Sequence, residues 1–284
     1  MIEHPLCIIA IPTYNGERFI PEALKSVQSQ TVADFKVVIS DDASTDRTYD
    51  ICKEFCAGDD RFVCIRQPEN ISSSANFQWL LDNTRSKYFV WLGGHDMLHP
   101  QFVEKHLKAM EADQTLALSY ANTRCINESS EFIENRDGGK PHRIADTPAQ
   151  RYRETFWRPG KGEAINMFFR REALKGSCMR PVASPDKIVL SRAAYWGPFN
   201  KIDEVLYIRR VLLSRTNNAE AKMRRITGKK KLRRSRLEPL LVFRQEFASL
   251  ERSRLERFLL DAMLCARLAR QYKTDLFRWL AGRY

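Results

Sequence analysis

The 284-residue sequence lacks any apolar run of the roughly 18 residues that a membrane-spanning helix requires. Its first residues include an acid and no basic run before a short apolar stretch, so we expect no signal peptide and a cytoplasmic protein. The seven cysteines contain no Cys-x-x-Cys pair, which leaves zinc clusters and dithiol redox motifs without support. Disorder is not expected either, because 43% of the residues are hydrophobic and 11% are aromatic.

Acidic residues are scarce in only one part of the chain. From residue 209 to residue 284 there are 21 Lys and Arg against 7 Asp and Glu, a net charge of +14, whereas the remainder carries −2 of the total +12. This asymmetry predicts two parts, a catalytic domain at residues 1–211 and a basic helical tail at residues 212–284.

Buried strands and amphipathic helices alternate through the first part. Strands are predicted at residues 6–11, 35–40, 62–66, 88–92, 116–122, 164–170 and 205–211. Helices are predicted at residues 19–30, 72–84, 100–112 and 184–195, and from an N-cap at Ser44 or Thr45 to about residue 57. The pattern weakens at residues 124–158, which we expect to form an acceptor-side loop. The alternation predicts an α/β fold with a doubly wound, mostly parallel sheet flanked by helices.

Polar side chains follow two of these strands directly. Tyr14 offers a ring just past the first strand, and Asp42 offers a hydrogen-bond acceptor just past the second. Ligands of such sheets bind beyond the carboxyl ends of the strands. Tyr14 and Asp42 could therefore stack on a nucleotide base and bind its edge. Turn formation and helix capping are the alternative roles of the second cluster, DDASTD at residues 41–46.

Two segments together resemble the family 2 glycosyltransferases, which have the GT-A fold. They are IAIPTYNGERFIPEALKSVQSQT at residues 9–31 and FKVVISDDASTDRT at residues 35–48, and the likeness extends over about residues 6–211. It implies that the position of Asp42 accepts the uracil N3–H and that Thr13 and Tyr14 line the uridine. The nucleotide-binding residues that it implies are Pro12, Thr13, Tyr14, Asn15, Glu17, Asp41, Asp42, Ser44 and, on the helix at 72–84, Asn76.

The family's metal-binding motif is altered in this chain. The principal aspartate position falls on His95, the preceding acidic positions fall on Gly93 and Gly94, and Asp96 follows. Imidazole suits Mn²⁺ better than Mg²⁺, which prefers oxygen ligands. The resemblance therefore implies a divalent cation, Mn²⁺ before Mg²⁺, bound by His95 and supported by Asp96. The alternative is that both residues only shape the loop before the next helix.

Asp186 matches the family's catalytic base at the start of a late helix, although Pro185 replaces the acid that often precedes it. A helix N-terminus stabilises an ionised carboxylate, which keeps such a base ready near neutral pH. Asp186 could instead complete a helix cap. Arg209 and Arg210 follow the last strand, where they could reach the diphosphate or remain solvated.

The tail combines the basic run KKKLRRSR at residues 229–236 with leucines and aromatics at helical intervals. Such helices suit an anionic membrane surface. We therefore expect a peripheral protein on the inner face of the cell membrane. Packing on the catalytic domain and homodimer formation are alternatives. Nucleic acid is not expected as a partner, because no nucleic-acid-recognition motif accompanies the basic run.

The resemblance implies an inverting glycosyltransferase that uses a nucleotide-diphospho sugar, a UDP-sugar before others. The acceptor would be a glycan or a lipid-linked saccharide of the cell surface. A sugar-nucleotide-binding or assembly protein without activity is the main alternative, because Gly93 and Gly94 replace acids. A nucleotidyltransferase of similar fold would need a glycine-rich, basic phosphate loop after the first strand, and PTYNGERF is not one.

Overall fold

The computed structural model describes residues 5–133, 147–157, 166–177, 179, 185–212, 245 and 250. The chain divides into two compact units, Met1–Leu232 and Arg233–Tyr284, and every helix and strand named below belongs to the first. The predicted basic tail at 212–284 lies outside the described residues, apart from residues 212, 245 and 250. Within the described ranges, no helix has both the length and the apolar character needed to span a bilayer.

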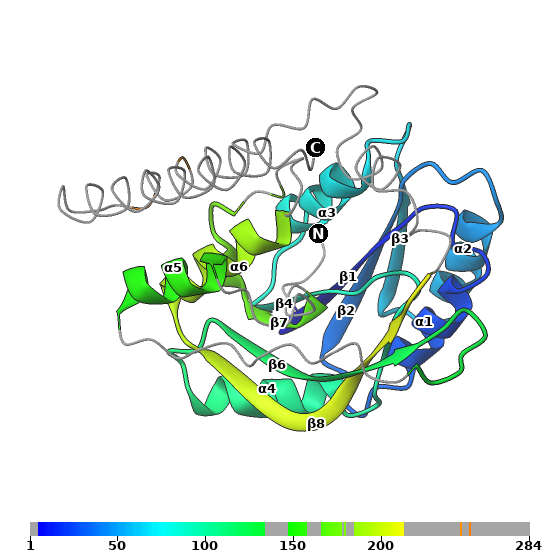
Figure 1. Cartoon of the computed structure of the whole chain (residues 1–284). Helices are drawn as coiled ribbons and strands as arrows, with labels where there is room; N and C mark the ends of the chain where they lie inside the picture. The colour runs from blue at the N-terminus through cyan, green and yellow to red at the C-terminus, as the bar shows by residue number, and fades with distance from the viewer. Residues whose placement is uncertain are drawn as a thin grey trace, which may run out of the picture. The chain divides into compact units, whose positions relative to one another are not determined.

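The first unit is built on one eight-stranded sheet with the strand order β3-β2-β1-β4-β7-β6-β8-β5 (Figure 1). The strands are β1 Cys7–Thr13, β2 Phe35–Asp41, β3 Phe62–Arg66, β4 Tyr88–Trp91, β5 Met97–Leu98, β6 Leu118–Ile126, β7 Phe168–Arg170 and β8 Phe199–Arg210. The helices are α1 Ile20–Gln28, α2 Thr48–Gly58, α3 Ser73–Asp82, α4 Phe102–Ala112, α5 Pro148–Trp157 and α6 Pro185–Trp196, with a 3₁₀ turn at Arg171–Leu174.

The half of the sheet from β3 to β4 is parallel, as the sequence predicts. The other half is mixed: β7 runs antiparallel to both of its neighbours, β8 is parallel to β6, and β5 is antiparallel to β8. Since β7 is antiparallel to both β4 and β6, these two neighbours are parallel to each other. The same direction is therefore shared by six strands, β1, β2, β3, β4, β6 and β8. Their carboxyl ends therefore meet at one edge of the sheet.

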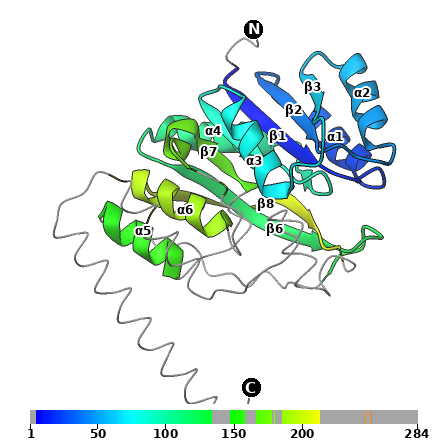
Figure 2. The same cartoon turned by 90° about the horizontal axis from the view of Figure 1, so that it is seen from above.

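Helices cover both faces of the sheet (Figures 1 and 2). The views place α3, α5 and α6 on one face and α1 and α4 on the other. β1 is buried along its whole length because it lies between β2 and β4, which explains its continuous apolar sequence. α1 begins with Pro21 in its first turn and presents Ile20, Ala23, Leu24 and Val27 to the core.

Several predicted boundaries were wrong. β8 begins at Phe199, six residues before the predicted start. Of the strand predicted at 164–170, the described residues 166 and 167 are not strand and β7 covers Phe168–Arg170, while residues 164 and 165 lie outside the described residues. α2 begins at Thr48 and is not capped by Ser44 or Thr45; Asp46 Oδ1 accepts the Thr48 N–H at 3.0 Å instead. α5 occupies part of the stretch that was expected to be a loop.

Candidate functional site

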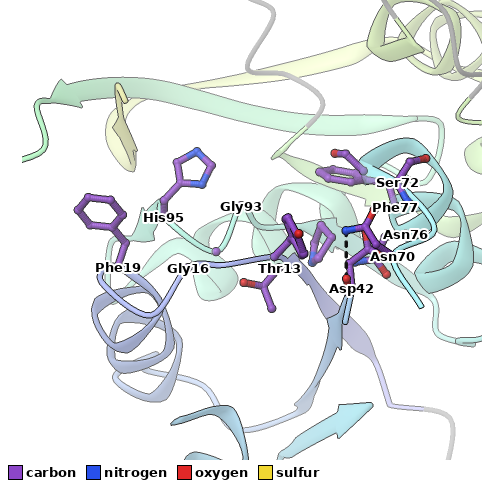
Figure 3. A pocket seen from close by; sticks show the side chains of 14 residues that line it. Thr13, Gly16, Phe19, Asp42, Asn70, Ser72, Asn76, Phe77, Gly93 and His95 are labelled. Atoms are coloured by element: carbon purple, nitrogen blue, oxygen red, sulfur yellow. Dashed lines mark hydrogen bonds between the residues drawn. The ribbon is translucent and has the colours of Figure 1, made fainter. Parts of the chain in front are cut away.

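A cavity of about 440 Å³ opens at the carboxyl edge of the parallel strands (Figure 3). Its size falls within the range of small-molecule sites. The ends of β1, β2 and β4 and the start of α3 line it. The lining residues are Pro12, Thr13, Tyr14, Gly16, Phe19, Asp42, Asn70, Ser72, Ser73, Asn76, Phe77, Gly93, Gly94 and His95. Of the predicted residues, Pro12, Thr13, Tyr14, Asp42, Asn76 and His95 therefore meet at one site.

Asp42 stands at one end of this cavity, where Figure 3 shows it beside Asn70 and away from Phe19 and His95. Its Oδ1 accepts the Ile71 N–H at 2.7 Å, and its backbone oxygen accepts an Asn70 side-chain N–H at 3.1 Å. Burial raises the pKa of Asp42, the Ile71 N–H opposes this rise, and the charge of Asp41 adds to it. A carboxylate has about four acceptor positions, so this anchored group can still bind the edge of a base.

The cavity lining does not include four of the predicted residues, Asn15, Glu17, Asp41 and Ser44. They connect the loop after β1 to the loop after β2. Asn15 N–H donates to Ser44 Oγ at 2.9 Å, and the Asn15 Oδ1 accepts the Thr45 N–H at 2.9 Å. Glu17 accepts the Arg47 N–H at 3.0 Å, and Asp41 accepts the Ser44 N–H at 3.0 Å. The loops after β1 and β2 are thus joined by hydrogen bonds, which hold Tyr14 and Asp42 in position.

Asn76 fastens α3 to β2. Its Nδ2 donates to the Ser40 backbone oxygen at 2.9 Å, and its Oδ1 accepts the Ser40 hydroxyl at 2.5 Å. The side chain is almost fully buried. It therefore positions the start of α3, where Ser73 and Phe77 line the cavity.

Gly93, Gly94 and His95, from the loop at residues 93–96, also line the cavity. A Cβ on Gly93 would lie 2.9 Å from Asp96 Oδ2, and a Cβ on Gly94 would lie 3.0 Å from Thr13 Oγ1 and 3.1 Å from Ile20 Cδ1. Contacts this short force neighbouring atoms to move. The two glycines thus fit a loop whose carboxylate, Asp96, folds back over Gly93.

Asp96 is buried, with 4% of its surface exposed, and both of its carboxylate oxygens accept hydrogen bonds from β8. Tyr207 Oη donates to Oδ2 at 2.7 Å, and the Arg210 N–H donates to Oδ1 at 2.9 Å. Burial, followed by the charge of Asp96, raises the pKa of Tyr207 well above its usual value. The phenol therefore stays protonated and remains a donor.

His95 and Asp96 are the candidate metal donors. His95 lines the cavity, whereas the buried Asp96 does not line it and has its Oδ1 3.9 Å from His95 Nε2. The described part of the chain contains no group of three His, Cys, Asp or Glu that could hold a metal alone. An imidazole and a carboxylate fit a cation that takes its remaining ligands from substrate phosphates and water.

Asp186 lies in the first turn of α6, half-buried, and does not line the cavity. α6 ends at Trp196, just before β8 begins at the sheet edge opposite the cavity. A 12-residue helix spans about 18 Å, and α6 lies beside α3 (Figures 1 and 2). The first turn of α6 is therefore directed toward the edge that carries the cavity.

Several residues of this site were not predicted from the sequence. Phe19, Asn70, Ser72 and Phe77 line the cavity, and Tyr207 supports it from a distant strand. Phe77 lies one helical turn after Ser73, a spacing that could have revealed it. Arg210 does not line the cavity, because its buried guanidinium donates to protein oxygens through all three of its nitrogens.

Comparison with known sequences identifies relatives of the first unit. A sequence profile described as "Glycosyl transferase family 2" matches residues 8–177, more than half of the chain. The chondroitin synthase of Pasteurella multocida (strain Pm70) is 33% identical over 132 residues, which are 46% of this chain and 14% of that protein. The chondroitin synthase of Escherichia coli is 36% identical over 132 residues, 46% of this chain and 19% of that protein. The chain thus matches less than a fifth of these synthases.

Solved structures share the fold at low sequence identity. S. aureus TarS 1-349 in complex with UDP-GlcNAc superposes with a TM-score of 0.68 at 15% identity, covering 94% of this chain and 72% of that one. The mannosyltransferase PcManGT from Pyrobaculum calidifontis, in complex with GDP-Man and Mn²⁺, gives a TM-score of 0.58 at 15% identity, covering 93% and 70%. These likenesses confirm the predicted GT-A fold.

Proposed function

The chain belongs to glycosyl transferase family 2, and on that basis we propose that it transfers a sugar, with inversion, from a UDP-sugar to a glycan or lipid-linked acceptor in polysaccharide synthesis. The observation that carries the proposal is the meeting of Tyr14, Asp42 and His95 in one cavity at the carboxyl edge of the sheet. Tyr14, 40% exposed, offers its ring for stacking, and Asp42 offers a fixed acceptor for the uracil N3–H. The diphosphate then extends toward His95, at the other side of the cavity in Figure 3.

The proposed donor carries a charge that the cavity does not neutralise. Among the described residues that line it there is no Lys or Arg, and His95 is the one basic side chain. We propose that a divalent cation, Mn²⁺ before Mg²⁺, binds with the diphosphate at His95 and Asp96. Such a cation neutralises the negative charge that develops on a leaving diphosphate. Isothermal titration of UDP with Mn²⁺, with Mg²⁺ and with EDTA tests this point: equal affinities in all three would contradict it.

We propose Asp186 as the base that removes the proton of the acceptor hydroxyl. The freed oxygen attacks the anomeric carbon, and the bond from that carbon to the diphosphate breaks on the opposite face. The nucleoside diphosphate leaves with the electron pair, and the proton stays on the Asp186 carboxylate. The N-terminus of α6 stabilises the ionised form of Asp186 before reaction.

Replacement of Asp186 by Asn tests the base. We expect transfer to fall by about 10²- to 10⁴-fold, the usual contribution of a general base, with UDP affinity unchanged. Asp203→Asn is the matched control, because Asp203 is exposed on β8 and pairs with a surface lysine, Lys201. Transfer that survives in Asp186→Asn would rule out this assignment.

A sugar-nucleotide-binding protein without activity is the second candidate, favoured by Gly93 and Gly94 at positions where acids are usual. A panel of nucleotide sugars, scored for binding and for hydrolysis with and without Mn²⁺, separates the two functions. Binding without turnover of any donor would establish the second.

We further propose that the basic tail, residues 212–284, rests on the anionic inner face of the membrane, near lipid-linked acceptors. The net charge of residues 212–284, +12 from 19 Lys and Arg against 7 Asp and Glu, supports this, at about 1 kcal/mol for each basic residue near such a surface. Flotation with anionic vesicles should recover the full chain, whereas neutral vesicles should not. Equal recovery of the protein with anionic and with neutral vesicles would favour packing of the tail on the catalytic domain or homodimer formation.

A further inference from the structure

The end of β8 holds the loop at residues 93–96 through two separate contacts. Tyr207 Oη and Arg210 N–H each bind a different oxygen of the Asp96 carboxylate, at 2.7 and 2.9 Å. One hydrogen bond to each oxygen fixes the plane of the carboxylate. It leaves a second acceptor position on each oxygen, including the Oδ1 that lies 3.9 Å from His95 Nε2.

The Arg210 side chain holds the backbone of the same loop. Its Nε donates to the His95 backbone oxygen at 3.3 Å, its Nη1 donates to Ser130 Oγ at 2.9 Å, and its Nη2 pairs with Glu22 Oε2 at 2.7 Å. The guanidinium also stacks 4.7 Å from the centre of the Phe19 ring, which lines the cavity. Arg210 is 2% exposed, so its charge is committed to this network.

The loop at residues 93–96 is already closed by its own backbone, so the contacts from Tyr207 and Arg210 are additional to those that form the turn. The Asp96 N–H already closes a turn onto the Gly93 backbone oxygen at 2.9 Å, and Gly93 leaves room for the carboxylate to fold back. The additional donors from β8 hold the Asp96 carboxylate and the backbone oxygen of His95, and thus the backbone from which the His95 ring extends.

We infer that Tyr207 and Arg210 are positioning residues that hold Asp96 and His95 in register for one divalent cation. This inference rests on the proposed function, because it takes the cation as part of donor binding. Hydrogen bonds that orient a metal-binding side chain commonly change metal affinity by 10- to 100-fold when they are removed. Tyr207 makes the contact that can be removed most cleanly, because phenylalanine keeps the ring and loses only the hydroxyl.

The test is Mn²⁺ affinity of Tyr207→Phe in the presence of UDP, measured by electron paramagnetic resonance and by calorimetry. We expect the Kd for Mn²⁺ to rise about 10- to 100-fold. UDP affinity in EDTA should stay unchanged, because Asp42, the proposed partner of the base, lies at the opposite side of the cavity from His95 (Figure 3). Asp96→Asn, which keeps the shape of the side chain and removes its charge, should lose Mn²⁺ affinity as well.

Tyr88→Phe is the matched control. Tyr88 is also a fully buried tyrosine of the sheet whose hydroxyl donates to a carboxylate, Glu111 Oε1, at 2.9 Å, and it does not line the cavity. We expect only Tyr207→Phe to lose Mn²⁺ affinity. If Tyr207→Phe binds Mn²⁺ as tightly as the wild type, or if both variants lose Mn²⁺ affinity equally, the positioning role is overturned, and the proposed cation is not. A wild-type chain that binds UDP no better with Mn²⁺ than with EDTA would overturn the proposed cation itself.

Discussion

Replacement of Asp42 by Asn should change which base the cavity prefers. In the native protein the Ile71 N–H donates to Asp42 Oδ1 at 2.7 Å. An asparagine must present an acceptor to this N–H, so its carbonyl oxygen will occupy the Oδ1 position. The amide NH₂ then occupies the position of the second oxygen, and the group offered to the base changes from an acceptor to a donor.

The size of the effect follows from the bond that is lost. A hydrogen bond to a charged group contributes about 1.5–3 kcal/mol, which corresponds to a loss of about 10- to 150-fold in UDP affinity. Cytosine carries an acceptor at N3 where uracil carries N–H, so the new amide of Asp42→Asn can donate to it. CDP affinity should therefore rise while UDP affinity falls. Because burial raises the pKa of Asp42, loss of its charge should not destabilise the fold.

Calorimetric titration of UDP and CDP into both proteins, with Mn²⁺ present, measures the UDP:CDP ratio directly. Asp50→Asn removes the same charge from an exposed position on α2, and we expect it to leave both affinities unchanged. A UDP:CDP ratio in Asp42→Asn within a factor of about two of the wild-type ratio, far below the change expected from the lost bond, would refute the assigned role of Asp42.

Three further predictions concern stability. Ser72 has φ +83° and ψ 154°, a region that costs a non-glycine residue about 1–3 kcal/mol, so Ser72→Gly should raise the melting temperature despite the entropy cost of glycine. Gly197→Ala would place a Cβ 2.2 Å from the Thr115 backbone oxygen and should cost about 3 kcal/mol in urea unfolding, whereas Gly58→Ala, with no atom within 4 Å, should cost nothing. Burial lowers the pKa of His106 to about 3, so below its unfolded pKa of about 6.5 only the unfolded chain gains this proton. The free energy of unfolding should therefore fall by up to about 1.4 kcal/mol per pH unit between about pH 6 and pH 4, and His106→Gln should flatten that slope.

The parallel half of the sheet was predictable because its strands are covered on both faces. β1, β2 and β4 are buried throughout or nearly so, which leaves an unbroken apolar signal in the sequence. The same topology brings the ends of these strands together, so Tyr14 and Asp42 could be placed at one site. The hydrogen-bond partners of Asp42 could not be predicted, because Ile71 and Asn70 belong to a loop in which the sequence shows no periodic pattern.

The mixed half of the sheet was less predictable because its local signals are weak. The first residues of β8 are mostly exposed or half-buried, and pairing with β6 makes them a strand. α5 has low overall hydrophobicity, and the buried hydrophobic residues among its described side chains are Tyr152 and Phe156, one turn apart. The contact between Asp96 and Tyr207 joins residues 111 positions apart, a distance over which sequence periodicity carries no information.

The two glycines of the altered motif change how a cation and a nucleotide would depend on each other. With Gly93 and Gly94 in place of acids, His95 and Asp96 are the protein donors that the described loop offers, and the carboxylate is already shared with Tyr207 and Arg210. A site with one negative charge binds a divalent cation weakly until the diphosphate supplies further oxygens. By linkage, the cation must then strengthen nucleotide binding by the same factor by which the nucleotide strengthens cation binding. Under the proposed function, a loop with glycine at these two positions can therefore form a metal-dependent donor site, provided that the geometry of His95 and Asp96 is fixed from outside the cavity.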